Sequence, residues 1–146
     1  LDTPRISKIR LRGKIDRIDR IGNVLRIIDY KTGVSDLNKS SWQNNWSQRN
    51  PKHNWQLFFY AYLMKDTLGS GLFQVGHYTL RDRNIYTPLE INKEAIYTNN
   101  DLLEFEQVLL EIIEEITHPD IPFSQTENKQ ACKYCVFNTY CERQSN

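Results

Sequence analysis

The chain has 146 residues, a charged fraction of 25%, a hydrophobic fraction of 39% and a formal net charge of +1. This length fits about one domain with a single core, and the composition is ordinary for a globular protein. No apolar run reaches the ~18 residues of a membrane span and no signal-peptide pattern opens the chain, so we expect a cytoplasmic protein with no membrane partner.

The first predicted elements are two strands joined by a tight turn. Ile9, Leu11 and Ile15 alternate with charged residues, which indicates a strand with one buried face. Val24 to Tyr30 is more continuously apolar and predicts a strand that is buried on both sides. Gly22-Asn23 between them is typical of a two-residue hairpin loop.

This hairpin places two carboxylates opposite each other. With a two-residue loop, residues pair when their numbers sum to 45, so Asp16 faces Asp29 and Asp19 forms an ion pair with Arg26. Carboxylates whose Cβ atoms are about 5 Å apart repel, and a hard divalent cation would relieve the repulsion. Lys31 projects from the same face as Asp29. Two acids and a lysine around one point suit metal-assisted phosphodiester hydrolysis, and a surface salt-bridge cluster is the alternative. A three-residue loop would turn Asp16 to the other face.

Helical and strand patterns alternate after the hairpin. A helix is predicted from Asn54 to about Thr67, since its apolar residues follow a 3.6-residue spacing. Two strands are predicted over Leu72 to Leu80 and Ile85 to Ile91. A second helix follows an Asn99/Asn100 cap and ends before His118-Pro119.

Charge is distributed unevenly along the chain. Residues 1–31 contain nine Lys and Arg against four Asp, whereas residues 101–120 contain seven acids and neither Lys nor Arg. A basic segment around the carboxylate pair would attract a polyanion. The alternative is a solvated strand face, formed by Lys8, Arg10, Arg12 and Lys14.

All three cysteines lie near the end of the chain. Cys132, Cys135 and Cys141 have the spacing C-x2-C-x5-C, which lets thiolates converge on one metal centre. Three ligands are one short of a closed zinc site or a four-cysteine cluster. His118 would complete a zinc site, although it lies fourteen residues upstream of Cys132. Three free thiols are the other interpretation.

The stretch from Gly13 to Gly33 resembles the active-site signature of the PD-(D/E)XK nuclease superfamily, in its RecB-like branch. That signature has a glycine, an "IDR" acid on one strand and "DYKTG" on the next, here Gly13, Ile15-Asp16-Arg17 and Asp29 to Gly33. The branch also carries a helix motif Q-L-x-x-Y, present from Gln56 to Tyr60. Gln56 and Tyr60 are four residues apart and share one helix face. Together the motifs are specific, and the resemblance covers nearly the whole chain.

The resemblance implies an α/β fold with a restriction-endonuclease-like core, in which a mixed central sheet is flanked by helices. We expect this core in residues 1–118 and an irregular, cysteine-bearing tail in residues 119–146, packed on the core. The chain starts at Leu1 without an initiator Met, and the family's upstream helix, often with a His or Glu near the metal, is expected to be missing. We therefore expect a C-terminal fragment, and His53 and His77 do not lie where the family places the missing residue.

The resemblance also implies a role for each site residue. Asp16 and Asp29 would bind Mg²⁺ or Mn²⁺, with the backbone carbonyl of Tyr30 as a further oxygen ligand. Lys31 would orient or activate the attacking water and counter charge on the phosphate. Gln56 and Tyr60 would position the lysine, the water or a phosphate oxygen. The alternative for both residues is ordinary helix packing.

RecB-like nucleases with this cysteine triplet complete a [4Fe–4S] cluster with a fourth cysteine far upstream. No such cysteine is present, so we expect the cluster in the full-length parent rather than in this fragment. The implied function is a metal-dependent deoxyribonuclease, an exonuclease or end-processing domain of DNA recombination or repair, with DNA and a helicase domain or subunit as partners. The isolated fragment is expected to bind metal weakly or to be inactive. The alternatives are an inactive nuclease-like module that binds DNA or braces a helicase, and a zinc-binding interaction domain.

Overall fold

The computed structural model describes residues 8–35, 37, 52–81, 85–127, 129–133 and 135–142. The chain divides into two compact units, Leu1–Glu114 and Glu115–Asn146. The first unit contains the sheet and the second contains the cysteines. The boundary at residue 118 and the packing of the tail on the core stay predictions.

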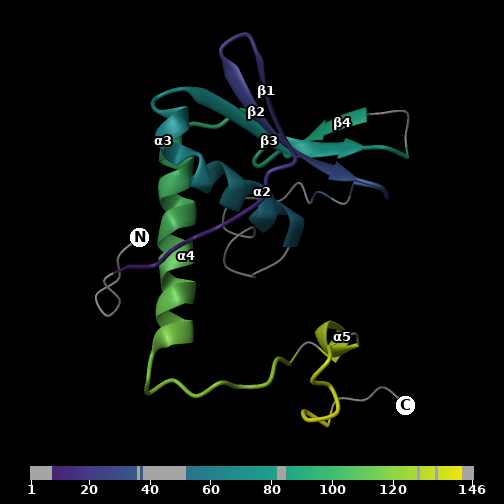
Figure 1. The fold of residues 1–146 in the computed structure, drawn as a ribbon, viewed down its shortest axis with the longest axis vertical. Helices are drawn as coiled ribbons and strands as arrows, with labels where there is room; N and C mark the ends of the chain where they lie inside the picture. The colour runs from purple at the N-terminus through teal and green to yellow at the C-terminus, as the bar shows by residue number, and fades with distance from the viewer. Residues whose placement is uncertain are drawn as a thin grey trace. The chain divides into compact units, whose positions relative to one another are not determined.

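Among the described residues of the first unit, four strands form a mixed sheet in chain order (Figure 1). The strands are β1 (Arg17–Ile21), β2 (Val24–Lys31), β3 (Leu72–Thr79) and β4 (Ile85–Pro88). β1 and β4 pair antiparallel with their neighbours, whereas β2 and β3 are parallel. Parallel strands need a crossover connection, which contains α2 (Lys52–Leu63) and α3 (Lys65–Leu68). This is the predicted α/β fold, a mixed sheet flanked by helices.

The hairpin between β1 and β2 has the predicted register. Five residue pairs connect the strands, from Arg17↔Ile28 to Ile21↔Val24, and the numbers of each pair sum to 45. Gly22, the first loop residue, has a φ of 58°, as a type II′ turn requires. The predicted ion pair is also present, because Asp19 Oδ1 lies 2.7 Å from Arg26 Nε.

Residues 8–15 form no strand, so the strand predicted from Ile9 to Ile15 is wrong. The cause is the path of the chain across α2, which Figure 1 shows. A Cβ atom on Gly13 would lie 2.6 Å from Leu63 Cδ1 and 3.2 Å from Tyr60 Cε1. The backbone therefore approaches α2 as closely as only glycine allows, instead of extending the sheet. The apolar residues that still pack against the core are Leu11 and Ile15.

α2 packs between the sheet and α4 (Asn99–Thr117). Its Phe58 ring centroid lies 6.2 Å from that of Phe73 on β3 and 6.1 Å from that of Phe105 on α4. Phe105 also contacts Trp55 and Tyr62 of α2. Burial of these rings supplies hydrophobic and aromatic packing energy. The largest fully buried side chains are Tyr97, Phe58, Phe73, Phe105, Ile27, Ile28, Leu57, Leu89, Ile91, His77 and Val75.

The helix limits differ in detail from the predictions. The single helix expected from Asn54 to Thr67 is two helices, because α2 ends at Leu63 and α3 follows it. α4 starts at Asn99 as expected, but its cap is Thr98, whose N–H and hydroxyl contact Asp101 Oδ2 at 2.7 and 3.0 Å. None of the helices in the described part of the chain has both the length and the apolar surface needed to cross a membrane.

The described part of the second unit contains the last three residues of α4, irregular chain, turns and the short helix α5 (Lys129–Cys132). The Cys135 N–H donates to the Cys132 carbonyl at 3.1 Å, and the Cys141 N–H donates to the Phe137 carbonyl at the same distance. The Gln125 side-chain amide donates to the Cys141 carbonyl at 3.2 Å. All three cysteines are free thiols of intermediate exposure.

Candidate active site

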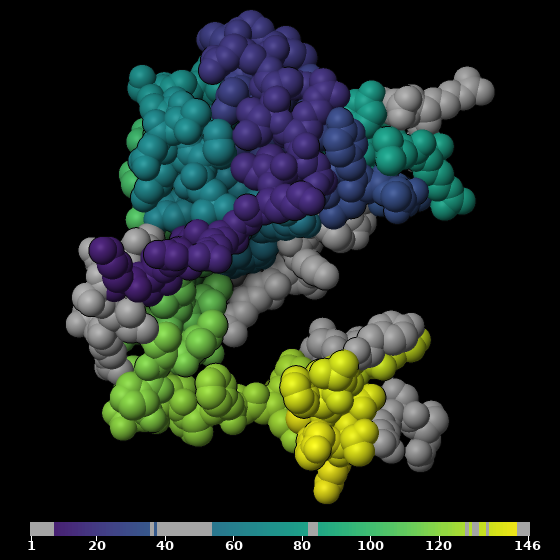
Figure 2. Space-filling model, in the orientation of Figure 1, coloured from purple at the N-terminus to yellow at the C-terminus, as the bar shows by residue number. Residues whose placement is uncertain are grey.

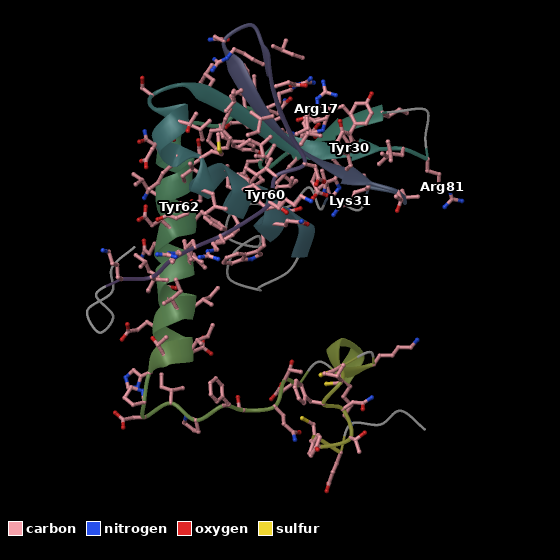
Figure 3. The ribbon with its side chains drawn as sticks, in the orientation of Figure 1. Arg17, Tyr30, Lys31, Tyr60, Tyr62 and Arg81 are labelled. Atoms are coloured by element: carbon pink, nitrogen blue, oxygen red, sulfur yellow. The ribbon has the colours of Figure 1, made fainter. Side chains whose placement is uncertain are left out.

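Four of the five predicted catalytic residues form one connected polar network. Lys31 Nζ lies 2.7 Å from Asp29 Oδ2 and donates to Gln56 Oε1 at 3.3 Å. Gln56 Nε2 donates to Asp29 Oδ1 at 3.1 Å and to the Tyr60 hydroxyl at 2.9 Å. Figure 3 shows Lys31 on β2 near Tyr60 on α2. Gln56 thus connects the acid, the lysine and the tyrosine.

Strand and helix periodicity place these side chains together. Ile27, Asp29 and Lys31 alternate along β2, so they project from one face of the sheet. Gln56 and Tyr60 are one helical turn apart on α2. Ile27 is fully buried in the same core cluster as two α2 side chains, Leu57 and Ala61. Apolar contacts therefore press α2 onto β2, and the polar network lies where this core ends.

Asp16 lies immediately before β1 and is exposed. The β1–β2 ladder stops at Arg17↔Ile28, one pair short of Asp16 and Asp29, so their direct opposition stays a prediction. Asp16 is nevertheless connected to the site, since its Oδ2 accepts a hydrogen bond from the Tyr30 N–H at 3.0 Å. Tyr30 is the residue whose carbonyl is predicted to bind the metal, and it separates Asp29 from Lys31.

Asp29 is a buried acid with one oxygen open to a further ligand. Its exposed fraction is 5%, and Lys31 provides the neighbouring positive charge. Asp29 Oδ2 is 2.7 Å from the ammonium, yet no described residue gives it a well-oriented hydrogen bond. The ion pair compensates the charge of this oxygen without saturating its lone pairs. Buried acceptors in this state are uncommon and are found at functional sites.

The donors around Asp29 suit a hard cation. Mg²⁺ is usually held by one or two carboxylates, with waters and substrate phosphates as its remaining ligands. Asp16, Asp29 and the Tyr30 carbonyl offer only oxygen atoms, and Asp29 Oδ2 has a free acceptor position. Within the described ranges, no three His, Cys, Asp or Glu side chains gather into a group that could hold a metal, and this includes the cysteines. A metal site with two carboxylates and a backbone carbonyl does not require three such side chains.

The opposite face of the sheet has a separate, structural set of charges. Arg26 donates to both oxygens of Asp19, at 2.7 and 2.8 Å, and its guanidinium lies 4.8 Å from the ring centroid of Tyr86. The hydrogen bond from Arg26 lowers the pKa of Asp19 below its usual value. Burial raises the pKa of the Tyr86 hydroxyl. Asp19 thus stabilises the sheet and is not part of the network around Asp29.

A comparison of the sequence with protein families identifies the family of this chain. Residues 2–142 match the family model of the PD-(D/E)XK nuclease superfamily. The chain belongs to the PD-(D/E)XK nuclease superfamily. Members of this superfamily are generally nucleases and typically use divalent metals. Searches of curated proteins and of solved structures returned no significant match.

One residue lies beside this network that the sequence interpretation did not place there. His77 lies on β3 as the register partner of Asp29, is fully buried, and has its Nδ1 3.1 Å from Ser35 Oγ. Strand alternation alone puts His77 on one face with Val75 and Thr79. It does not supply the parallel register, so no local signal could have placed His77 beside the acid. The side chain of His53 lies outside the described residues.

Proposed function

We propose that this protein is a metal-dependent deoxyribonuclease, an exonuclease or end-processing enzyme that hydrolyses phosphodiester bonds in DNA recombination or repair. One observation carries the proposal: the buried Asp29 carboxylate keeps an open oxygen beside the Lys31 ammonium, in a chain of the PD-(D/E)XK superfamily. A buried acid and a cation held together in this way can bind a metal and a phosphate at one point.

Asp16, Asp29 and the Tyr30 carbonyl would hold Mg²⁺ or Mn²⁺. When bound, the metal would act as a Lewis acid toward the phosphate and lower the pKa of a water ligand. The hydrogen bond between Asp16 and the Tyr30 N–H supports this set, because it fixes two of the three residues relative to each other.

Lys31 is suited to orienting the attacking water and to countering charge that develops on the phosphate. Gln56 restricts the ammonium, because its Oε1 accepts from Lys31 while its Nε2 is bound to Asp29 and Tyr60. An amide with both ends engaged cannot rotate without losing hydrogen bonds. Gln56 and Tyr60 would therefore act by positioning Lys31. Correct orientation of reacting groups is a main source of catalytic rate enhancement.

DNA is the proposed substrate because a basic surface leads into the site. The segment before Asp16 lies on the surface of the first unit in Figure 2, at the purple end of the colour range. Such a segment attracts a polyanion and makes binding dependent on salt. Its exposed basic residues are Lys8, Arg10, Arg12 and Lys14.

Cleavage of labelled DNA in Mn²⁺ tests the proposal. Asp29→Asn and Lys31→Ala should each lower the rate by about 10²–10³-fold, since each removes charge from the reaction centre. Asp66→Asn is the matched control, because Asp66 is an exposed acid on α3. Chelation by EDTA should abolish cleavage. Cleavage by Lys31→Ala at the rate of the unmodified protein would contradict the proposed mechanism.

An inactive nuclease-like module that binds DNA or braces a helicase is the second candidate. The position of Asp16 favours it, because this exposed residue lies one pair beyond the end of the β1–β2 ladder and its opposition to Asp29 stays a prediction. Salt-dependent DNA binding without cleavage in the presence of Mn²⁺ would support this candidate over the enzyme.

We extend the proposal to the RecB-like branch, with a [4Fe–4S] cluster in the full-length parent and a helicase domain or subunit as partner. The support is the cysteine spacing and the tight turn in which Cys135 donates to the Cys132 carbonyl at 3.1 Å. The parent protein, purified without oxygen, should be brown and contain iron and sulfide. Zinc in its elemental analysis would instead indicate a zinc site built on the cysteines.

A further inference from the structure

His77 on β3 and Ser35, four residues after β2, lie beside the network of Asp29, Lys31 and Gln56. The register of β2 and β3 places His77 directly beside Asp29 and Thr79 directly beside Lys31. Register partners in a sheet project from the same face. The imidazole therefore stands next to the Asp29 carboxylate, with no exposed surface of its own. A rigid group at this position limits where the carboxylate can move.

Ser35 returns the chain to this histidine after β2 has ended. The Lys31 carbonyl accepts a hydrogen bond from the Leu80 N–H at 2.9 Å, and β2 ends at Lys31. Four residues later, Ser35 Oγ lies 3.1 Å from His77 Nδ1. Because His77 lies beside Asp29 rather than at the strand end, residues 32–35 must fold back over the face that carries the site.

Ser35 lies at the edge of a hollow in the described part of the first unit. Ser35 lines a hollow of about 230 Å³, so part of its surroundings is not filled by side chains of the described residues. Among the described residues, the contact with His77 is one restraint on the segment after Lys31. The other residues that line this hollow are Val34, Thr79, Ile85 and Thr87.

We propose that Ser35 and His77 are positioning residues of the nuclease site. His77 flanks the Asp29 carboxylate and, through Ser35, anchors the segment that leaves Lys31, so that the acid and the ammonium keep one relative position. This inference rests on the proposed function for its catalytic consequence. Its structural consequence, a defined metal-binding position for Asp29, does not depend on cleavage.

The test compares Ser35→Ala, His77→Phe, His77→Asn and the double variant Ser35→Ala/His77→Phe in the 146-residue chain. Phe keeps a ring without a hydrogen-bonding nitrogen, whereas the Asn amide stands close to the position of Nδ1. Thr87→Val is the control, since Thr87 lines the same hollow and pairs with His77 from β4. Three quantities are measured: kcat and KM on DNA with Mn²⁺, the Mn²⁺ dissociation constant from loss of the free-ion EPR signal without DNA, and the folded fraction by circular dichroism.

We expect Ser35→Ala and His77→Phe to lower kcat by about 10–100-fold with KM unchanged, because misplacement of reacting groups by about 1 Å has effects of this size. Both should weaken Mn²⁺ binding severalfold. The double variant should be no worse than His77→Phe alone, because both single variants remove the same Ser35–His77 contact. His77→Asn should recover most of the activity, and Thr87→Val should match the unmodified protein.

Unchanged Mn²⁺ affinity and kcat per folded molecule in Ser35→Ala would overturn the inference, as would additive losses in the double variant. An unmodified protein that binds Mn²⁺ but does not cut DNA would refute the proposed function alone. In that case the effect of Ser35→Ala on Mn²⁺ affinity still decides the positioning role. An unmodified protein that does not bind Mn²⁺ would overturn both.

Discussion

Replacement of Lys31 by methionine should destabilise the protein strongly when no metal is bound. The ammonium is 2.7 Å from the Asp29 carboxylate, which is 5% exposed. Methionine keeps much of the length and volume of lysine but carries no charge. Asp29 would then be a buried carboxylate with only the Gln56 amide as its described polar partner.

The structure sets the size of the effect. At 2.7 Å the attraction between the two charges is about 6 kcal/mol at an effective dielectric of about 20. Desolvation of both groups offsets much of this gain, and removal of one partner from a buried pair costs about 3–5 kcal/mol. The Lys31 side chain is 21% exposed, so we expect the lower end, about 3 kcal/mol. For a domain of this size, that loss corresponds to a fall in Tm of about 6–12 °C.

Thermal unfolding in EDTA, followed by circular dichroism, measures the loss. Lys65→Met is the matched control, because Lys65 is 41% exposed and lies 3.5 Å from Glu106. Exposed pairs of this kind contribute about 0–1 kcal/mol. Mn²⁺ at a hundred times its dissociation constant should then restore about 2.7 kcal/mol to Lys31→Met, since the ion binds only the folded state.

Equal melting temperatures for Lys31→Met and Lys65→Met in EDTA would refute this reasoning. Asp29 would then not depend on Lys31 for charge compensation, and the ion pair would be no stronger than a surface contact. A failure of Mn²⁺ to stabilise Lys31→Met would separately refute Asp29 as a metal ligand.

Three smaller effects should follow from the same structure. Asp19→Asn should lose ~1 kcal/mol of stability at pH 7. Because Arg26 lowers the pKa of Asp19, the difference in unfolding free energy between the two proteins should disappear as the pH falls below the usual carboxyl pKa of 3.8. Urea titrations at several pH values measure this difference. Gly76→Ala should cost about 1–3 kcal/mol in urea unfolding, since the new Cβ would lie 2.5 Å from a carbonyl oxygen of β4, whereas Gly33→Ala, with nothing within 4 Å, should be neutral. Tyr60→Phe removes one neutral hydrogen bond, so it should cost ~1 kcal/mol of stability and lower kcat severalfold while KM for DNA stays unchanged.

Local periodicity accounts for the parts of the fold and site that the sequence predicts well. The Gly22-Asn23 loop determines the hairpin register, and that register pairs Asp19 with Arg26 as expected. The four-residue spacing of Gln56 and Tyr60 places both on one face of α2, where they bind each other. These relations depend only on the geometry of one strand pair or one helix.

Relations between distant segments account for the errors. The alternation from Ile9 to Ile15 predicts a strand, but alternation cannot show whether a partner strand is available. Gly13 instead takes the chain across α2. The contact of His77 with Ser35 likewise depends on the parallel register of β2 and β3, which no residue of either strand encodes by itself. At α4 the error was small, because Thr98 and the neighbouring asparagines are all residues that favour caps.

Because β2 and β3 pair in parallel, we expect the site to form late in folding. The hairpin of β1 and β2 closes a two-residue loop, whereas the contact of Asp29 with His77 requires the whole α2–α3 crossover to close first. Contacts that close longer loops carry a larger entropic cost and form more slowly. During refolding, recovery of nuclease activity should therefore coincide with burial of Phe58 rather than with hairpin formation. Recovery of the proposed activity would thus report on completion of the tertiary fold.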